Sequence, residues 1–180
     1  TAERVMINYL QTMSGIATKT ESYVKKAKKF GVKVFDTRKT IPLFRYESKY
    51  AVHVGGGFNH RMGLYDGILI KENHLRYLKN LNKFFKEVRD SNPKIEIIAE
   101  IESLKQLYSA IDYIDVALLD NMNLTKIKKA VKIAKGKIQL EVSGNVSLKT
   151  VEKIASTKID RISIGDLTKN INCVDITLLI

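Results

Sequence analysis

The sequence has 180 residues, a length typical of one domain, with 44% hydrophobic and 28% charged residues. These proportions exclude a disordered or low-complexity chain. Lysine and arginine number 31 against 19 aspartates and glutamates, which gives a formal net charge of +12. Such an excess predicts an anionic partner: a nucleic acid, a membrane surface or a polyanionic metabolite.

The cysteine content and the length of the apolar runs limit the cellular compartments in which we expect the protein. Cys173 is the only cysteine, so an intrachain disulfide and a zinc finger are excluded. No apolar run approaches the roughly 18 residues of a membrane span, and Thr1–Gln11 has a helical pattern rather than that of a signal peptide. We therefore expect a cytoplasmic protein that does not enter membranes, with residues removed upstream of Thr1.

The first predicted element is helical and covers residues Ala2–Phe30. Val5, Tyr9 and Met13 recur at helical spacing, and we expect Ser14 and Gly15 to interrupt the helix. The second part carries a run of lysines. Nucleic-acid binders usually interleave aromatic residues with such a run, so we interpret it as a solvated helix face.

After Gly31 the pattern changes to short apolar runs that alternate with helical segments. The runs are Val32–Phe35, Ile68–Ile70, Ile95–Ala99, Val116–Leu119, Ile138–Val142 and Ile162–Ile164. Their length and their Ile, Val and Leu content are typical of strands buried on both faces. The predicted helices are Phe44–Val54, Asn73–Asp90, Ser103–Ile111, Leu124–Lys135 and Leu148–Ser156. This alternation predicts a parallel α/β fold.

A charged residue or a phosphate-compatible glycine lies at the carboxyl end of every predicted strand. In a parallel barrel these ends meet on one rim, where active sites lie, whereas a doubly wound sheet needs such chemistry only near its switch point. A complete barrel takes about 250 residues. We therefore expect an incomplete TIM-like α/β barrel of about six parallel strands, preceded by N-terminal helices.

Two cationic motifs follow the first strand. Thr37, Arg38 and Lys39 offer a planar fork and a compact charge for a carboxylate or phosphate, although a solvated basic turn is equally compatible. Three glycines precede His60 and Arg61, which supply two donors. The glycines match neither a Walker loop nor a dinucleotide fingerprint, and their structural alternative is a flexible connection.

Three further strand ends carry charged candidates. Lys71 ends the second strand, where a snorkelling surface lysine is the alternative interpretation. Glu100 and Asp120 end the next two strands. These carboxylates suit sugar hydroxyls, water-bound Mg²⁺ or a developing positive charge, while a structural pairing with lysines is the alternative.

The last two strands end in small and polar residues. Ser143, Gly144 and Asn145 follow one strand and Gly165 follows the other. Glycine after a late barrel strand is a common phosphate-binding feature, although a serine here also suits a helix cap.

The ordered set of motifs resembles the barrel domain of the quinolinate phosphoribosyltransferase family over essentially the whole chain. The motifs are Asp-Thr-Arg-Lys-Thr at 36–40, Gly-Gly-Gly-Phe-Asn-His-Arg at 55–61, Leu-Ile-Lys-Glu-Asn-His at 69–74 and Leu-Glu-Val-Ser-Gly-Asn at 140–145. The segment 2–18 also looks like the start of that domain. The resemblance implies phosphoribosyl transfer from 5-phosphoribosyl 1-pyrophosphate to quinolinate, with Mg²⁺. The products would be nicotinate mononucleotide, pyrophosphate and CO₂, in NAD biosynthesis.

The resemblance also implies roles for residues on the rim. The residues implied as catalytic are Lys39, Lys71, Glu100 and Asp120. Those facing the quinolinate carboxylates would be Arg38, His60, Arg61 and Lys71, with Lys39 and Lys71 near the pyrophosphate and Thr37 among the substrate contacts. Glu100 and Asp120 would hold ribose hydroxyls and, through water, the Mg²⁺ on the donor. The 5′-phosphate would lie against Ser143, Gly144, Asn145 and Gly165.

Two departures from the family pattern stand out. The family carries an α/β domain before the barrel, whose arginine reaches the active site of the partner subunit in a homodimer, and the resemblance implies that residues 1–180 lack it. Asp166 also stands where the family has a small apolar residue, so we expect it to point away or to pair with a cation such as Lys169. A related phosphoribosyltransferase with another acceptor and a non-catalytic nucleic-acid-binding module are the alternative functions.

Overall fold

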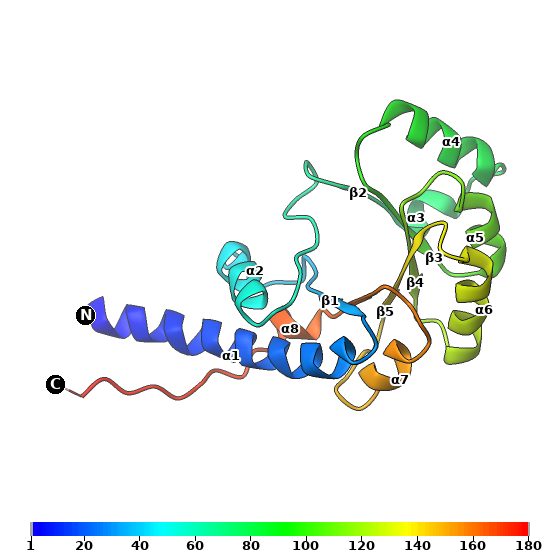
Figure 1. Cartoon of the computed structure of the whole chain (residues 1–180). Coiled ribbons are helices and arrows are strands. Elements are labelled where there is room, and N and C mark those ends of the chain that lie inside the picture. The colour runs from blue at the N-terminus through cyan, green and yellow to red at the C-terminus, as the bar shows by residue number, and fades with distance from the viewer. Residues whose placement is uncertain (1, 180) are drawn as a thin grey trace.

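The computed structural model describes residues 2–179, in which six strands alternate with helices (Figure 1). The strands are β1 (Lys33–Phe35), β2 (Ile68–Ile70), β3 (Ile97–Ile101), β4 (Val116–Asp120), β5 (Gln139–Ser143) and β6 (Arg161–Ser163). The helices are α1 (Ala2–Lys28), α2 (Arg45–Val54), α3 (Glu72–Leu75), α4 (Leu81–Ser91), α5 (Leu104–Ala110), α6 (Leu124–Ala134), α7 (Val151–Ala155) and α8 (Asp166–Lys169). Among the described helices, none has both the length and the apolar character needed to cross a membrane.

The strands form one parallel sheet in the order β1-β6-β5-β4-β3-β2. The first strand thus pairs with the last, as in a barrel. Within residues 2–179, β1 and β2 do not pair, so the barrel is open between them. Phe58 forms one parallel bridge with Phe35 on the free side of β1. The predicted incomplete barrel of six parallel strands is confirmed.

The apolar core lies mainly between the sheet and its covering helices. Figure 1 shows α4, α5 and α6 together on one side of the strands. Alternate residues of the strands, among them Ala99 and Leu119, pack there against Leu107 and Ile127. The inner face of the sheet carries a much smaller apolar cluster, which frees the rest of that face for polar side chains.

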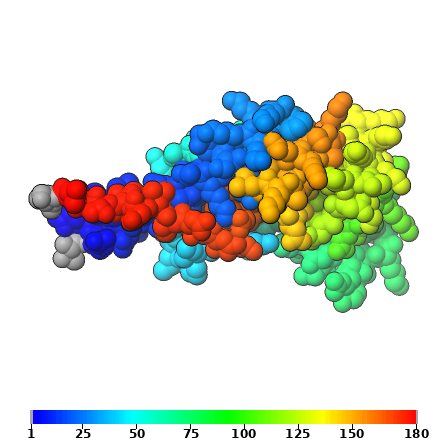
Figure 2. Space-filling model, turned by 90° about the horizontal axis from the view of Figure 1, so that it is seen from below, coloured from blue at the N-terminus to red at the C-terminus, as the bar shows by residue number. Residues whose placement is uncertain are grey.

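Helix α1 is continuous, so the predicted interruption at Ser14 and Gly15 is wrong. Gly15 is buried and lies against the C-terminal segment: a β-carbon there would lie 3.2 Å from the Cα of Cys173. The N–H of Val174 donates to the carbonyl of Gln11 at 3.1 Å. Figure 2 shows this segment running along α1. The glycine therefore serves a close backbone contact and not a break.

Two other helix predictions need correction, and one helix was missed. The single helix expected over 73–90 is two helices, because the chain turns after α3 and Asn80 caps α4 by accepting a hydrogen bond from the N–H of Lys83. Helix α7 is shorter than the predicted 148–156, and the short helix α8 was not predicted. These are single-turn differences that periodicity alone does not resolve.

The three glycines at 55–57 bring α2 against α1. Gly55 ends α2, and a β-carbon on it would collide with the carbonyl of Ala17. A β-carbon on Gly57 would lie 2.8 Å from the side chains of Thr20 and Val52. The close approach that the sequence suggested is therefore between two helices, and the flexible-connection alternative is wrong.

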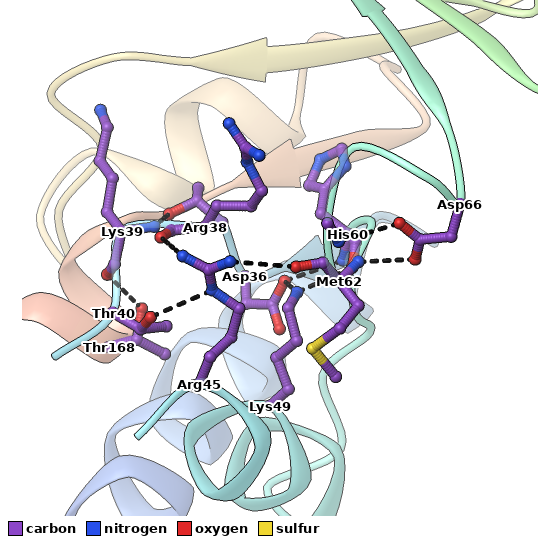
Figure 3. A network of polar contacts seen from close by, with 12 residues as sticks. Asp36, Arg38, Lys39, Thr40, Arg45, Lys49, His60, Met62, Asp66 and Thr168 are labelled. Atoms are coloured by element: carbon purple, nitrogen blue, oxygen red, sulfur yellow. Dashed lines mark hydrogen bonds and ion pairs between the residues drawn. The ribbon is translucent and has the colours of Figure 1, made fainter. Parts of the chain in front are cut away.

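A fully buried ion pair joins α2 to the end of β1 (Figure 3). Lys49 Nζ lies 2.6 Å from Asp36 Oδ1, and the two side chains are 1% and 0% exposed. Lys49 also donates to the carbonyl of His60 at 2.7 Å, and Asp36 Oδ1 accepts the N–H of His60 at 2.8 Å. Burial raises the pKa of Asp36, while Lys49 and the His60 N–H oppose that rise. The pair therefore fixes the main chain at His60.

We expect Gly55→Ala to destabilise the fold by about 1–3 kcal/mol, since the added methyl group collides with backbone that has no room to move. Urea denaturation measures this loss. The control is Gly67→Ala, where a β-carbon would lie at an ordinary 3.4 Å from Arg61 Cβ. Equal stability of the two variants would contradict the close-packing role.

We expect Lys49→Met to cost about 3–5 kcal/mol of unfolding free energy, because it leaves the Asp36 carboxylate buried without a cation. Adding Asp36→Asn should recover part of the loss, since the two changes remove the same interaction. The control is Lys137→Met, which removes an exposed ion pair of 3.7 Å and should cost about 1 kcal/mol at most. A Lys49→Met loss as small as the control's would show that the pair does not hold α2.

Candidate active site

Because side chains alternate between the two faces of a strand, four polar residues lie on the inner face of the sheet. Three of them are predicted site residues and the fourth, Glu141, is their neighbour. Leu118 belongs to the inner apolar cluster and is the register partner of both Glu100 and Glu141. Asp120, two residues later, is the partner of Ser143. Because register partners share a face, Glu100, Asp120, Glu141 and Ser143 all face the interior of the open barrel.

Helix α2 holds the loop after β1 and the loop before β2 through hydrogen bonds from its side chains. Arg45 donates to the carbonyls of Arg38 and Met62, each at 3.2 Å, and to the hydroxyl of Thr40 at 3.3 Å. Arg45 and Lys49 are four residues apart and share one face of α2. Figure 3 shows both side chains reaching from the helix to the main chain of these loops. Two cations are thus used to fix loop geometry.

The side chains of Arg38, Lys39 and His60 extend away from α2 (Figure 3). Thr37 Oγ1 accepts the N–H of Lys39 at 3.1 Å, which tightens the turn. Gly165, after β6, lies beside this turn: a β-carbon there would be 3.2 Å from Lys39 Cδ. The structure therefore brings together predicted residues from the loops after the first and last strands.

Arg61 lies beside Arg38. Burial and the charge of Arg38 lower the pKa of Arg61, and its Nη1 donates to the carbonyl of Gly67 at 2.8 Å. Two neighbouring guanidinium groups repel each other unless an anion lies between or near them. The position therefore suits a ligand with carboxylate or phosphate groups.

His60 faces a carboxylate that the sequence analysis did not include among the site residues. Its Nε2 lies 2.6 Å from Oε1 of Glu141, whose side chain is fully buried. The ring of Phe35 packs against the imidazole at a centroid distance of 5.2 Å. The side chain of His60 is thereby held on two sides.

The carboxylates of β3 and β4 have different partners. Asp120 accepts the hydroxyl of Ser143 at 2.6 Å and the amide of Asn121 at 2.7 Å. The structure thus brings Ser143 to Asp120, whereas the resemblance implies a phosphate contact for it. Burial, together with a hydrogen bond to Glu72, raises the pKa of Glu100 to about 7, while Lys71 opposes the rise.

The segment that follows β4 packs closely against the segment that follows β5. Gly144 has a φ of 90°, and a β-carbon on it would lie 2.6 Å from Cγ of Asn121. Asn145 and Asn121 both have a φ of 51°, and the Asn145 amide donates to Asn121 Oδ1 at 3.3 Å. Glycine is required at 144 because both its backbone conformation and the space available exclude a side chain.

Asp166 pairs with a cation, as expected, but the cation is Lys19 of α1, at 2.5 Å, and not Lys169. Burial acts to raise the pKa of Asp166, but hydrogen bonds from Lys19 and Asn170 outweigh it and lower that pKa. The cation that neutralises the Asp166 carboxylate lies far from it in the sequence, so the residues around Asp166 do not indicate the pairing. Gly165 lies beside Lys39, and the negative charge of the next residue, Asp166, is compensated by Lys19.

A cavity of about 390 Å³ opens where β1 and β2 fail to meet. His60 and Arg61 line it together with Lys49, Asp66 and Arg161. Glu100, Asp120 and Ser143 lie outside its lining, on the inner face of the neighbouring strands. Within residues 2–179, no group of three or more His, Cys, Asp or Glu side chains is placed to hold a metal ion.

Sequence reasoning missed Arg45, Lys49, Glu141 and Glu72 as members of the site. For two of them a signal exists: Lys49 shares the buried side of its helix with Val52, and Glu141 stands between two apolar residues of a strand. A charged residue at a core position usually has a buried partner. For Arg45 and Glu72 the sequence contains no such signal.

The chain matches the family model "Quinolinate phosphoribosyl transferase, C-terminal domain" over residues 16–179. It is 38% identical over 178 residues to the probable nicotinate-nucleotide pyrophosphorylase (carboxylating) of Bacillus subtilis, covering 98% of this chain and 62% of that protein. It is 37% identical over 199 residues to the mitochondrial quinolinate phosphoribosyltransferase (decarboxylating) 2b of Nicotiana tabacum, covering 99% of this chain and 56% of that protein.

A solved structure gives the same answer. The nicotinate-nucleotide pyrophosphorylase of Francisella tularensis superimposes with a TM-score of 0.92 at 44% identity, covering 97% of this chain and 62% of the other. The chain therefore spans less than two thirds of the length of these relatives. By sequence and by fold, it belongs to the quinolinate phosphoribosyltransferase family, whose C-terminal domain it matches.

Proposed function

We propose that this chain transfers the phosphoribosyl group of 5-phosphoribosyl 1-pyrophosphate to quinolinate, with loss of CO₂, in NAD biosynthesis. The observation that carries the proposal is the pairing of cations with carboxylates around one open barrel interior. Arg38, Lys39 and His60 extend to one side of α2, and Glu100 and Asp120 lie on the inner face of β3 and β4. This combination suits two anionic substrates and a cationic transition state.

The reaction divides naturally between the two groups of residues. Arg38, His60 and Arg61 would bind the two carboxylates of quinolinate and orient its ring nitrogen towards the ribose. Lys39 and Lys71 would hold the departing pyrophosphate. As the bond between C1 and pyrophosphate breaks, positive charge develops on the ribose, and Glu100 and Asp120 would stabilise that charge.

Decarboxylation then follows from the bond just formed. Once the ring nitrogen carries the ribose it is cationic, and its positive charge stabilises the electron pair that the breaking C2–carboxylate bond leaves on C2. CO₂ departs and C2 takes up a proton, which gives nicotinate mononucleotide. The chain's contribution to this step is to hold the second carboxylate in place beside Arg38 and Arg61 while the first is lost.

Mg²⁺ belongs to the proposal as a companion of the pyrophosphate donor. Glu100 and Asp120 supply the carboxylate oxygens that Mg²⁺ prefers, and Glu100 Oε2 is buried without a hydrogen-bond partner. These donors fit an ion held through water. When bound, the ion would neutralise charge on the pyrophosphate.

Homodimer formation, and completion of the site by residues that the relatives carry beyond this domain, are also part of the proposal. Aromatic and aliphatic side chains remain exposed on α1 and α2, among them Tyr9, Leu10, Tyr46 and Tyr50. Exposed apolar surfaces of this kind suit a protein contact. A cytoplasmic location is proposed as well; the tobacco relative is named as mitochondrial.

The direct test is calorimetric titration of nicotinate mononucleotide into the chain, since the product probes the ring, ribose and phosphate positions without turnover. We expect saturable binding that the double variant Glu100→Ala, Ser143→Ala abolishes. The control is Glu152→Ala, Ser156→Ala on α7, whose side chains contact Lys26 and the carbonyl of Lys153. The control should bind like the parent chain.

Other outcomes of this titration would redirect the assignment. Binding of a different pyridine nucleotide in preference to nicotinate mononucleotide would indicate a relative with another acceptor. Indifference to all phosphoribosyl ligands, with steeply salt-dependent binding of DNA or RNA, would contradict the proposal in favour of a nucleic-acid module.

The raised pKa of Glu100 predicts an acid limb in the pH profile. Below pH 7 Glu100 is protonated and no longer stabilises positive charge, so kcat/KM should fall as the pH falls through about 7. Glu72→Gln removes a negative neighbour that raises this pKa and should move the limb to lower pH. Glu102→Gln, on an exposed side chain after β3, should leave it in place. Carbon-13 NMR of the Glu100 carboxyl group follows the same titration without substrate.

A further inference from the structure

Glu141 is a buried carboxylate with a single polar partner. It lies in the middle of β5, its side chain is 0% exposed, and Oε1 lies 2.6 Å from Nε2 of His60. Its other oxygen, Oε2, is buried with no hydrogen-bond partner among the described residues. An ionised carboxylate in such a place is very costly unless a cation or strong donors compensate it.

The other charged groups that line the cavity with His60 already have partners, as does Asp36, which bonds to the main chain of His60. The lining groups are Lys49 on α2, Arg61 and Asp66 on the loop before β2, Glu96 before β3 and Arg161 on β6. Lys49 pairs with Asp36, and Arg161, the register partner of Glu141, directs its Nη2 to Glu96 at 2.8 Å. Asp66 accepts main-chain N–H groups, and Arg61 donates to a carbonyl. Among the described residues, the imidazole is the group that bonds to Glu141.

We propose that Glu141 is a positioning residue: its carboxyl group holds Nε2 of His60, so that Nδ1–H is presented as a donor to a carboxylate of the pyridine substrate. This rests on the proposed function. With Nε2 bonded to Glu141, Nδ1 is the nitrogen left for the ligand, and no described residue bonds to it. A ring without a proton on Nδ1 would instead offer an acceptor there and repel a carboxylate.

The surroundings hold the imidazole in this orientation. The main chain of His60 is fixed on both sides of its Cα, since the N–H bonds to Asp36 and the carbonyl to Lys49. The ring packs against Phe35. Glu141 sits on a central strand paired on both edges, so it cannot move to follow the ring. The donor is therefore placed before substrate arrives, which is how such groups lower the cost of binding.

The test compares the parent chain with Glu141→Gln, which keeps the size of the side chain but removes its charge. Nitrogen-15 NMR of the ligand-free parent should show a proton on Nδ1 of His60. In the variant both tautomers of the ring should be populated, because an amide both donates to and accepts from Nε2. Quinolinate binding should weaken roughly 10- to 100-fold in the variant, as expected for loss of a charge-assisted hydrogen bond.

The matched control is Asp115→Asn. It removes a carboxylate from another ion pair, that with Arg89, at the opposite end of the sheet, and should leave His60 and quinolinate affinity unchanged. Affinity for the phosphoribosyl donor should not change in either variant. An unprotonated Nδ1 in the parent chain, or unaltered quinolinate affinity in Glu141→Gln, would overturn the role of Glu141. If the parent bound no quinolinate, the proposed function would fail, while the nitrogen shifts would still decide which ring nitrogen of His60 carries the proton.

Discussion

The buried pair between Asp36 and Lys49 is the interaction on which the site depends. Both charged side chains of this pair are buried away from solvent. A hydrophobic pair of the same size would hold the helix as well or better. What a hydrophobic pair would not do is bond to the N–H and the carbonyl of His60. The ion pair therefore gives geometric definition to a loop that has no regular structure of its own. Stability is a secondary result.

The open barrel divides its two faces between stability and chemistry. The outward face and its helices hold the main apolar core, from Ala99 to Leu119. The inner face carries carboxylates at Glu100, Asp120 and Glu141, which a packed core would not tolerate. A complete barrel fills its interior with side chains, whereas this one leaves a seam between β1 and β2. The seam makes the polar interior accessible to a ligand.

The sequence was sufficient for the strands, because short runs of β-branched and apolar residues between helical segments have few alternative interpretations. It also placed the candidate residues at the carboxyl ends of the strands, which must lie together in a parallel sheet. It was insufficient for contacts between distant segments. Asp166 looks as if it should pair with the nearby Lys169, but its partner is Lys19. Gly15 looks like a helix break, but it accommodates a segment from the far end of the chain. Lys49 and Glu141 stand at core positions of a helix and a strand, but the sequence does not show which partners are buried with them.

The pairing of β1 with β6 has a consequence for the order in which the protein is made. The strand that leads into the Asp36 loop finds its neighbour only when the last strand has left the ribosome. Until then, one edge of β1 is unpaired, and the loop that carries Arg38 and Lys39 has no Gly165 beside it. Such distant pairings are slow to form and leave a strand edge exposed in the meantime. The region from β2 to β5 has only neighbouring contacts to make, so it can assemble first. The candidate active site is then the last part of this fold to be completed during synthesis.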